Sequence, residues 1–133
     1  MTALIKQTPG AIGYVEFGYA ENNNLTMASL QNKAGNFVAP SIRSGTSTLA
    51  SVTLPENLRA FITDPEGAED YPIATFTWLL VKKTYTDAAK AAAVKAFVTY
   101  GLTKGQAAAP GLGYIPLPSS VATKVAAALA TVK

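Results

Sequence analysis

An arginine and the short polar turn behind it are the residues best suited to chemistry in this sequence. Arg43, Ser44, Gly45 and Thr46 stand at the start of a predicted helix. Backbone amides point outward at a helix N-terminus, hydroxyl groups donate hydrogen bonds, and a guanidinium group binds two oxygens at once. The four residues are therefore candidates for binding an oxyanion. The alternative is that they are polar residues on an exposed helix face, because such short strings arise often by chance.

Four carboxylates lie close together further along the chain, in a run of turn-forming residues that ends at Pro72. They are Asp64, Glu66, Glu69 and Asp70. Calcium binds several oxygen ligands, so a cation site is one interpretation. Their spacing is not that of an EF-hand loop, and a solvated turn that blunts the edge of a strand is the other interpretation.

The composition argues against enzyme chemistry. The chain contains no histidine and no cysteine. Histidine is the commonest general base and metal ligand, and cysteine is a common nucleophile. A Ser-His-Asp triad is impossible, and a zinc site would have to consist of carboxylates alone. We therefore expect no catalytic residues, no metal and no cofactor.

Length and charge place further limits on function. A chain of 133 residues fits one domain, and 49% hydrophobic with 14% charged residues excludes disorder. Residues 1–81 hold four Lys/Arg and seven Asp/Glu, giving −3, whereas residues 82–133 hold seven lysines and one aspartate, giving +6. The lysines form either a basic face or the solvated sides of helices. Arginine is absent after Arg59 and aromatics do not interleave with the lysines, so nucleic acid is not an expected partner.

Hydrophobic patterning predicts strands mixed with helices, which is the α/β class. The expected strands cover residues 11–17, 25–31 and 74–81, with a further pairing at 37–38. Helices are expected from the cap Ser41, from the cap Thr86 with Asp87 at the positive end, and from Pro118 or Ser119. One stripe is expected to face inward on the second of these helices: Ala89, Ala93, Ala96, Phe97 and Tyr100.

Three aromatic residues are interpreted as core rather than as ligand contacts. Trp78 sits inside the strongest predicted strand, and Tyr14 and Tyr114 each follow a glycine. Ligand stacking is the alternative for all three, but aromatic burial with a tethered polar tip is the commoner arrangement.

Two observations bear on membranes. No segment reaches the run of about 18 apolar residues that a transmembrane helix needs. Residues 1–7 lack the basic start and apolar middle of a signal peptide, so a secreted parent protein would need a leader that these residues do not supply.

Four segments of the chain form a recognisable series. They are Thr8-Pro9-Gly10-Ala11-Ile12-Gly13-Tyr14-Val15-Glu16-Phe17, then Asn24-Leu25 with residues 30–35, then Tyr71-Pro72-Ile73, and finally Leu112-Gly113-Tyr114-Ile115-Pro116-Leu117-Pro118. In their order and spacing these segments resemble the phosphate-binding proteins of bacterial ABC importers, of the PstS type. The resemblance extends over nearly the whole chain.

This resemblance implies a fold, a function and a location. The fold is a partial type II periplasmic-binding-protein fold, with residues 1–63 at the C-terminal end of lobe two and residues 64–133 in the crossover and the C-terminal part of lobe one. The function is binding of inorganic phosphate for delivery to a membrane permease, in the periplasm or at the cell surface. The chain resembles roughly the last two fifths of such a protein.

The resemblance also bears on the phosphate ligands. In the family these are hydroxyls and amides near the N-terminus, an aspartate that accepts the phosphate proton, and an Arg-x-Asp-x-Ser-Gly-Thr stretch in lobe two. All of them are expected before the first residue of this chain. Arg43, Ser44, Gly45 and Thr46 imitate the last stretch, but they follow the Pro-Gly-Ala-Ile-Gly-Tyr segment rather than precede it, and the aspartate is missing. No phosphate-binding role is therefore assigned to them.

A segment that belongs to two lobes cannot complete either core alone. Unpaired strand edges and apolar helix faces are expected to remain open and to cause self-association, by exchanged elements between copies. Two further functions stay open beside phosphate binding: an oligomerising structural piece without ligand activity, and a phosphatase, since some members of the wider family are phosphatases.

Overall fold

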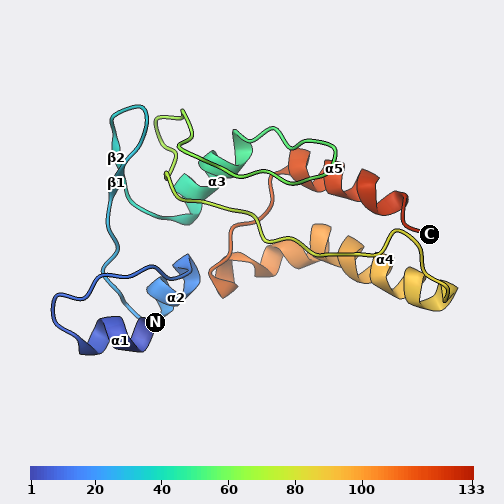
Figure 1. Cartoon of the computed structure of the whole chain (residues 1–133), viewed down its shortest axis with the longest axis horizontal. Helices are drawn as coiled ribbons and strands as arrows, with labels where there is room; N and C mark the ends of the chain where they lie inside the picture. The colour runs from blue at the N-terminus through green and yellow to red at the C-terminus, as the bar shows by residue number, and fades with distance from the viewer.

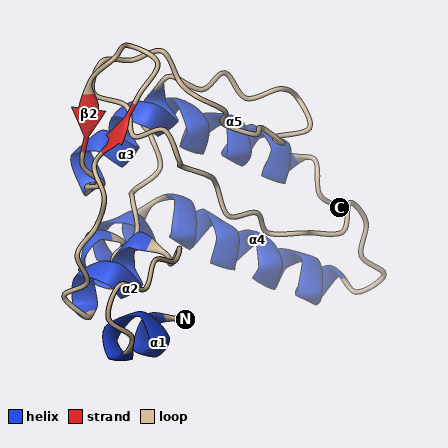
Figure 2. Ribbon diagram, turned by 60° about the vertical axis from the view of Figure 1, so that its left-hand side comes forward, coloured by secondary structure: helices blue, strands red, loops and turns tan.

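Helices and long extended segments make up most of the molecule. The computed structural model describes residues 1–133, and Figure 1 shows α3 and α5 on one side, α4 on the other, and extended chain between them. Figure 2 shows the same arrangement, with α1 and α2 at the lower left and the small sheet above them, beside α3. In chain order the elements are α1 (Thr2–Gln7), α2 (Phe17–Asn22), β1 (Leu30–Gln31), β2 (Phe37–Val38), α3 (Ile42–Ala50), α4 (Ala88–Leu102), the 3₁₀ helices η1 (Lys104–Ala108) and η2 (Pro110–Leu112), and α5 (Ser119–Ala130).

The start of α3 follows from a reciprocal cap. The side chain of Ser41 accepts a hydrogen bond from the backbone of Ser44, and the Ser44 hydroxyl accepts one from the backbone of Ser41. This capping box satisfies two amides that no helical carbonyl can reach. The predicted cap at Ser41 is confirmed.

The two later helices begin near the predicted residues. Asp87 caps α4, and its Oδ1 accepts from the amides of Ala89 and Lys90 at 2.9 and 3.1 Å. The assignment of Thr86 as the cap was wrong by one residue, because a carboxylate is as good a cap as a hydroxyl and also suits the helix dipole. Pro118 directly precedes α5, as predicted.

A single hairpin forms the only sheet. β1 and β2 pair antiparallel, with Leu30 opposite Val38 and Gln31 opposite Phe37. The predicted pairing at residues 37–38 is confirmed. Of the strand expected over residues 25–31, only the last two residues are in a strand.

The two longer predicted strands are absent. Residues 11–16 are irregular and lead into α2, and residues 74–81 are irregular throughout. Their β-branched and aromatic residues favour a strand only where a neighbouring strand offers backbone partners. No such neighbour is present for either segment, so both predictions were wrong.

The hydrophobic core is small. It centres on Leu49 of α3, Leu54 in the following loop, Phe76 in the extended segment and Val121 of α5. Only 16 of the 133 residues are buried, so large apolar side chains remain at the surface, among them Ile12 at 97% and Leu80 at 99% exposure. This is far less burial than a chain of this length usually reaches.

The inward face of α4 also differs from the prediction. The residues of the expected stripe are exposed, and the helix buries Ala91 and half-buries Val94 and Val98 instead. Alanine and valine occur on every side of this helix, so spacing alone did not select one face.

The structure contradicts the three predictions that placed aromatic residues in the core. Tyr14 and Tyr114 are exposed, so the prediction that they are core residues was wrong. Trp78 is also exposed, at 40%, so its placement in the core was wrong as well. Its ring centroid lies 6.4 Å from that of Phe61, and its Nε1 donates to the Leu58 carbonyl at 2.8 Å.

None of the helices combines the length and the hydrophobicity that crossing a bilayer requires.

Candidate functional site

Arg43 lies in the first turn of α3 and holds a carboxylate of the same chain. Its Nη2 lies 2.6 Å from Glu69 Oε1, and its Nε lies 3.2 Å from Glu69 Oε2. Two parallel hydrogen bonds of this kind are the way in which a guanidinium group also binds phosphate. Glu69 therefore occupies the oxygen positions that an oxyanion would take at Arg43.

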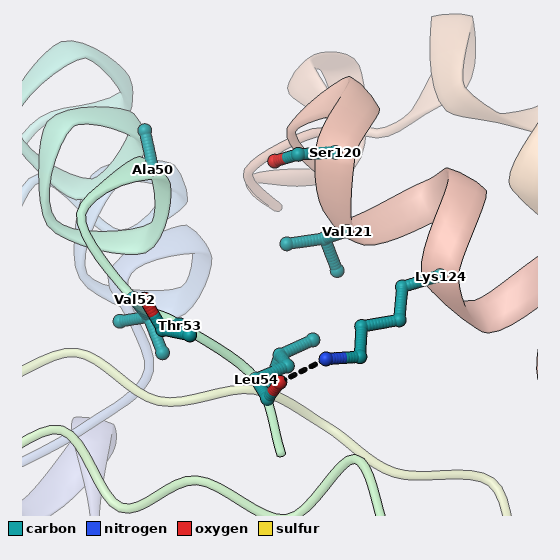
Figure 3. A pocket seen from close by; sticks show the side chains of 7 residues that line it. All are labelled: Ala50, Val52, Thr53, Leu54, Ser120, Val121 and Lys124. Atoms are coloured by element: carbon teal, nitrogen blue, oxygen red, sulfur yellow. Dashed lines mark hydrogen bonds between the residues drawn. The ribbon is translucent and has the colours of Figure 1, made fainter. Parts of the chain in front are cut away.

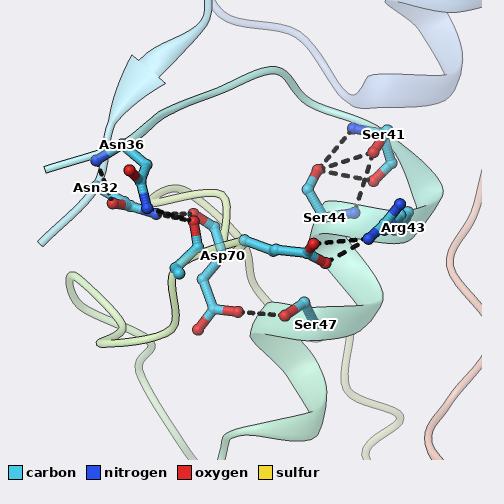
Figure 4. Close-up of polar contacts among 9 residues, drawn as sticks. Asn32, Asn36, Ser41, Arg43, Ser44, Ser47 and Asp70 are labelled. Atoms are coloured by element: carbon cyan, nitrogen blue, oxygen red, sulfur yellow. Dashed lines mark hydrogen bonds and ion pairs between the residues drawn. The ribbon is translucent and has the colours of Figure 1, made fainter. Parts of the chain in front are cut away.

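The next residue, Ser44, points away from solvent. It is buried, and its hydroxyl donates to the Ala39 carbonyl at 2.9 Å in addition to its part in the helix cap. Figure 4 shows Ser41 and Ser44 facing each other at the beginning of α3, with Arg43 directed toward the acidic turn. The Ser44 hydroxyl is therefore committed to the fold.

Gly45 and Thr46 complete the predicted group. A β-carbon at Gly45 would lie 2.1 Å from Ile115 Cδ1, so this glycine permits close packing of α3 against the segment before α5. The Thr46 hydroxyl donates to the Ile42 carbonyl at 2.7 Å. The four predicted residues are neighbours on one helix turn, but they do not converge on a shared open site.

The acidic turn joins α3 through Asp70. This carboxylate is 1% exposed and accepts from Ser47 Oγ at 2.6 Å and from the Gly67 amide at 3.1 Å. Ser51 Oγ lies 3.5 Å from its other oxygen, and the Tyr71 carbonyl accepts from Thr48 at 3.1 Å. Asp70 thus accepts hydrogen bonds from donors on two segments. The prediction of a fully solvated turn was therefore wrong for this residue.

A single asparagine connects the turn to the hairpin. Asn32 Nδ2 donates to the carbonyls of Gly67, Ala68 and Asp70 at 3.1, 3.0 and 3.2 Å, and its Oδ1 accepts from the Asn36 amide. Figure 4 shows Asn32 and Asn36 above the turn, with Asp70 extending toward Ser47. Sequence reasoning missed Asn32, because the three carbonyls that accept from its Nδ2 lie more than 30 residues away in sequence.

The other carboxylates of the turn are used in ion pairs or left in solvent. Glu66 Oε1 lies 2.6 Å from Lys33 Nζ on the exposed surface. This hydrogen bond lowers the pKa of Glu66 and raises that of Lys33. No group of three or more acidic side chains converges in a way that would hold a metal ion.

Two shallow cavities border α3. The first, of about 310 Å³, lies between the loop after α3 and the start of α5, where Figure 3 shows Thr53 and Ser120 on opposite walls. Its one charged side chain, Lys124, donates to the Leu54 carbonyl. The second, of about 300 Å³, lies beside Arg43 and Phe37. Both are at the small end of the range for ligand sites.

Two distant segments meet at a pair of glycines. A β-carbon at Gly113 would lie 2.3 Å from the Cα of Gly18, so α2 and the turn after η2 touch through their backbones. Close by, the negative charge of Glu16 raises the pKa of Tyr114. The residue that directly follows the first segment of the family resemblance is therefore in contact with the last segment.

Comparison with known proteins identifies the class. A family model described as the PBP superfamily domain matches residues 1–104, and the chain belongs to this superfamily. The chain folds into several helices and one small sheet, and it matches only part of the length of its relatives.

Three similar proteins carry the name phosphate-binding protein PstS. The phosphate-binding protein PstS of Pasteurella multocida is 34% identical over 129 residues, which cover 96% of this chain and 38% of that protein. PstS of Haemophilus influenzae is 32% identical over 127 residues, covering 94% and 38%. PstS of Methanocaldococcus jannaschii is 38% identical over 138 residues, covering 92% and 35%. The predicted resemblance to PstS is confirmed, and the chain spans little more than a third of the length of these relatives.

Proposed function

We propose that this chain is part of a phosphate-specific solute-binding component of an ABC importer, and that it supplies scaffold rather than phosphate ligands. The supporting observation is the match of more than nine tenths of the chain to proteins named phosphate-binding protein. The whole component binds inorganic phosphate in the periplasm or at the cell surface and delivers it to a membrane permease. It carries out no covalent chemistry.

The hydrogen bonds around α3 support the second half of the proposal. Arg43 is engaged by Glu69, Ser44 by the helix cap, and Thr46 by a helix carbonyl. A phosphate ion would have to displace Glu69 and find its remaining hydrogen-bond donors elsewhere. We therefore place the phosphate ligands of the complete component outside residues 1–133.

The division of the chain at residue 63 is part of the same proposal. Residues 1–63 contribute the end of one lobe, and residues 64–133 contribute the crossover and part of the other. The hydrogen bonds of Asp70 to Ser47 and of Glu69 to Arg43 then join the two parts.

Calorimetric titration of the chain with inorganic phosphate, with sulfate as the matched control anion, tests the scaffold role. The expected result is no binding in the micromolar range for either anion. Micromolar binding of phosphate that Arg43→Ala abolishes would contradict the scaffold role and restore residues 43–46 as a site. Retained binding in Arg43→Ala would place the site elsewhere in the chain and would contradict it equally.

A second candidate function is an oligomerising piece without ligand activity. It is favoured by the exposure of large apolar side chains such as Ile12 and Leu80. A phosphatase is the least favoured, because the chain has no histidine or cysteine. Hydrolysis of a generic phosphomonoester by the purified chain, with no hydrolysis by a mock preparation, would support a phosphatase.

A further inference from the structure

We draw no further inference here: the strongest candidate, the surface patch of exposed apolar side chains (Ile73, Leu79 and Leu80) on the irregular segment between the acidic turn and α4, carries none, because nothing in the structure shows what covers it and the chain spans little more than a third of the length of its relatives.

Discussion

Ser47 Oγ lies 2.6 Å from Asp70 Oδ1, and Asp70 is among the least exposed residues of the chain. A carboxylate at this depth is stable only when hydrogen-bond donors surround it. Here they come from α3 and from the Gly67 amide within the acidic turn. This contact fixes the acidic turn on α3 and so positions the first residue of the extended stretch that follows.

Replacing Asp70 should therefore destabilise the fold. In Asp70→Asn, the Ser47 hydroxyl has to accept from the amide instead of donating, and the charge-assisted hydrogen bonds of the buried carboxylate become weaker, neutral ones. The expected loss is about 1–3 kcal/mol of unfolding free energy in urea denaturation. The matched control is Asp64→Asn in the same turn, where the side chain is exposed and asparagine tolerates the positive φ of 47°. Equal stability of the two variants would contradict the role of Asp70.

Gly45 should tolerate no larger residue without a rearrangement of Ile115. Gly45→Ala brings a methyl group within 2.1 Å of Ile115 Cδ1, and overpacking of this kind costs about 1–3 kcal/mol. Adding Ile115→Val removes the clashing atom and should recover part of the loss. Gly111→Ala is the control, because a β-carbon there meets nothing within 4 Å. Thermal unfolding is compared for the unmodified protein, Gly45→Ala, Gly45→Ala with Ile115→Val, and Gly111→Ala. The comparison distinguishes a steric clash from the general effect of replacing a glycine by alanine.

The Lys33–Glu66 pair predicts a pH dependence with a definite sign. The pKa of Glu66 is lowered from 4.5, so its contribution to stability is present above pH 4.5 and disappears as the pH falls through the lowered value. The pKa of Lys33 is raised from 10.5, so the contribution is present below pH 10.5 and disappears as the pH rises through the raised value. The effect is small and screened by salt, because both side chains are exposed.

Melting temperatures of the protein and of Glu66→Gln across this pH range measure the contribution. The two curves should differ modestly near neutrality and converge in acid. Divergence that grows as the pH falls below 4.5 would show that Glu66 acts through another partner.

Local signals predicted the features that local physics determines. The cap at Ser41, the pairing at residues 37–38 and the proline before α5 all involve residues close together in sequence, and each is where the sequence indicated. The spacing of apolar residues was less informative for α4, which is rich in alanine on every side and buries Ala91 rather than the stripe with Phe97.

Strands depend on partners, and this is why residues 11–17 and 74–81 were mispredicted. Valine, isoleucine and aromatics favour an extended chain, but hydrogen bonds come from a neighbouring strand that propensity does not identify. The contacts of the candidate site were missed for the same reason. Arg43 was correctly located at the start of a helix, but its partner Glu69 and the burial of Asp70 depend on contacts 23 or more residues away.

The most direct measurement of the proposed function is phosphate affinity in a chimera. Residues 1–133 would replace the matching 129-residue stretch of PstS from Pasteurella multocida, with the unmodified relative as control. If this chain is scaffold of a phosphate-binding component, the folded chimera should bind phosphate and discriminate against sulfate, with affinity close to that of the control. A chimera that unfolds cooperatively like the control but binds no phosphate, or binds both anions alike, would contradict the account.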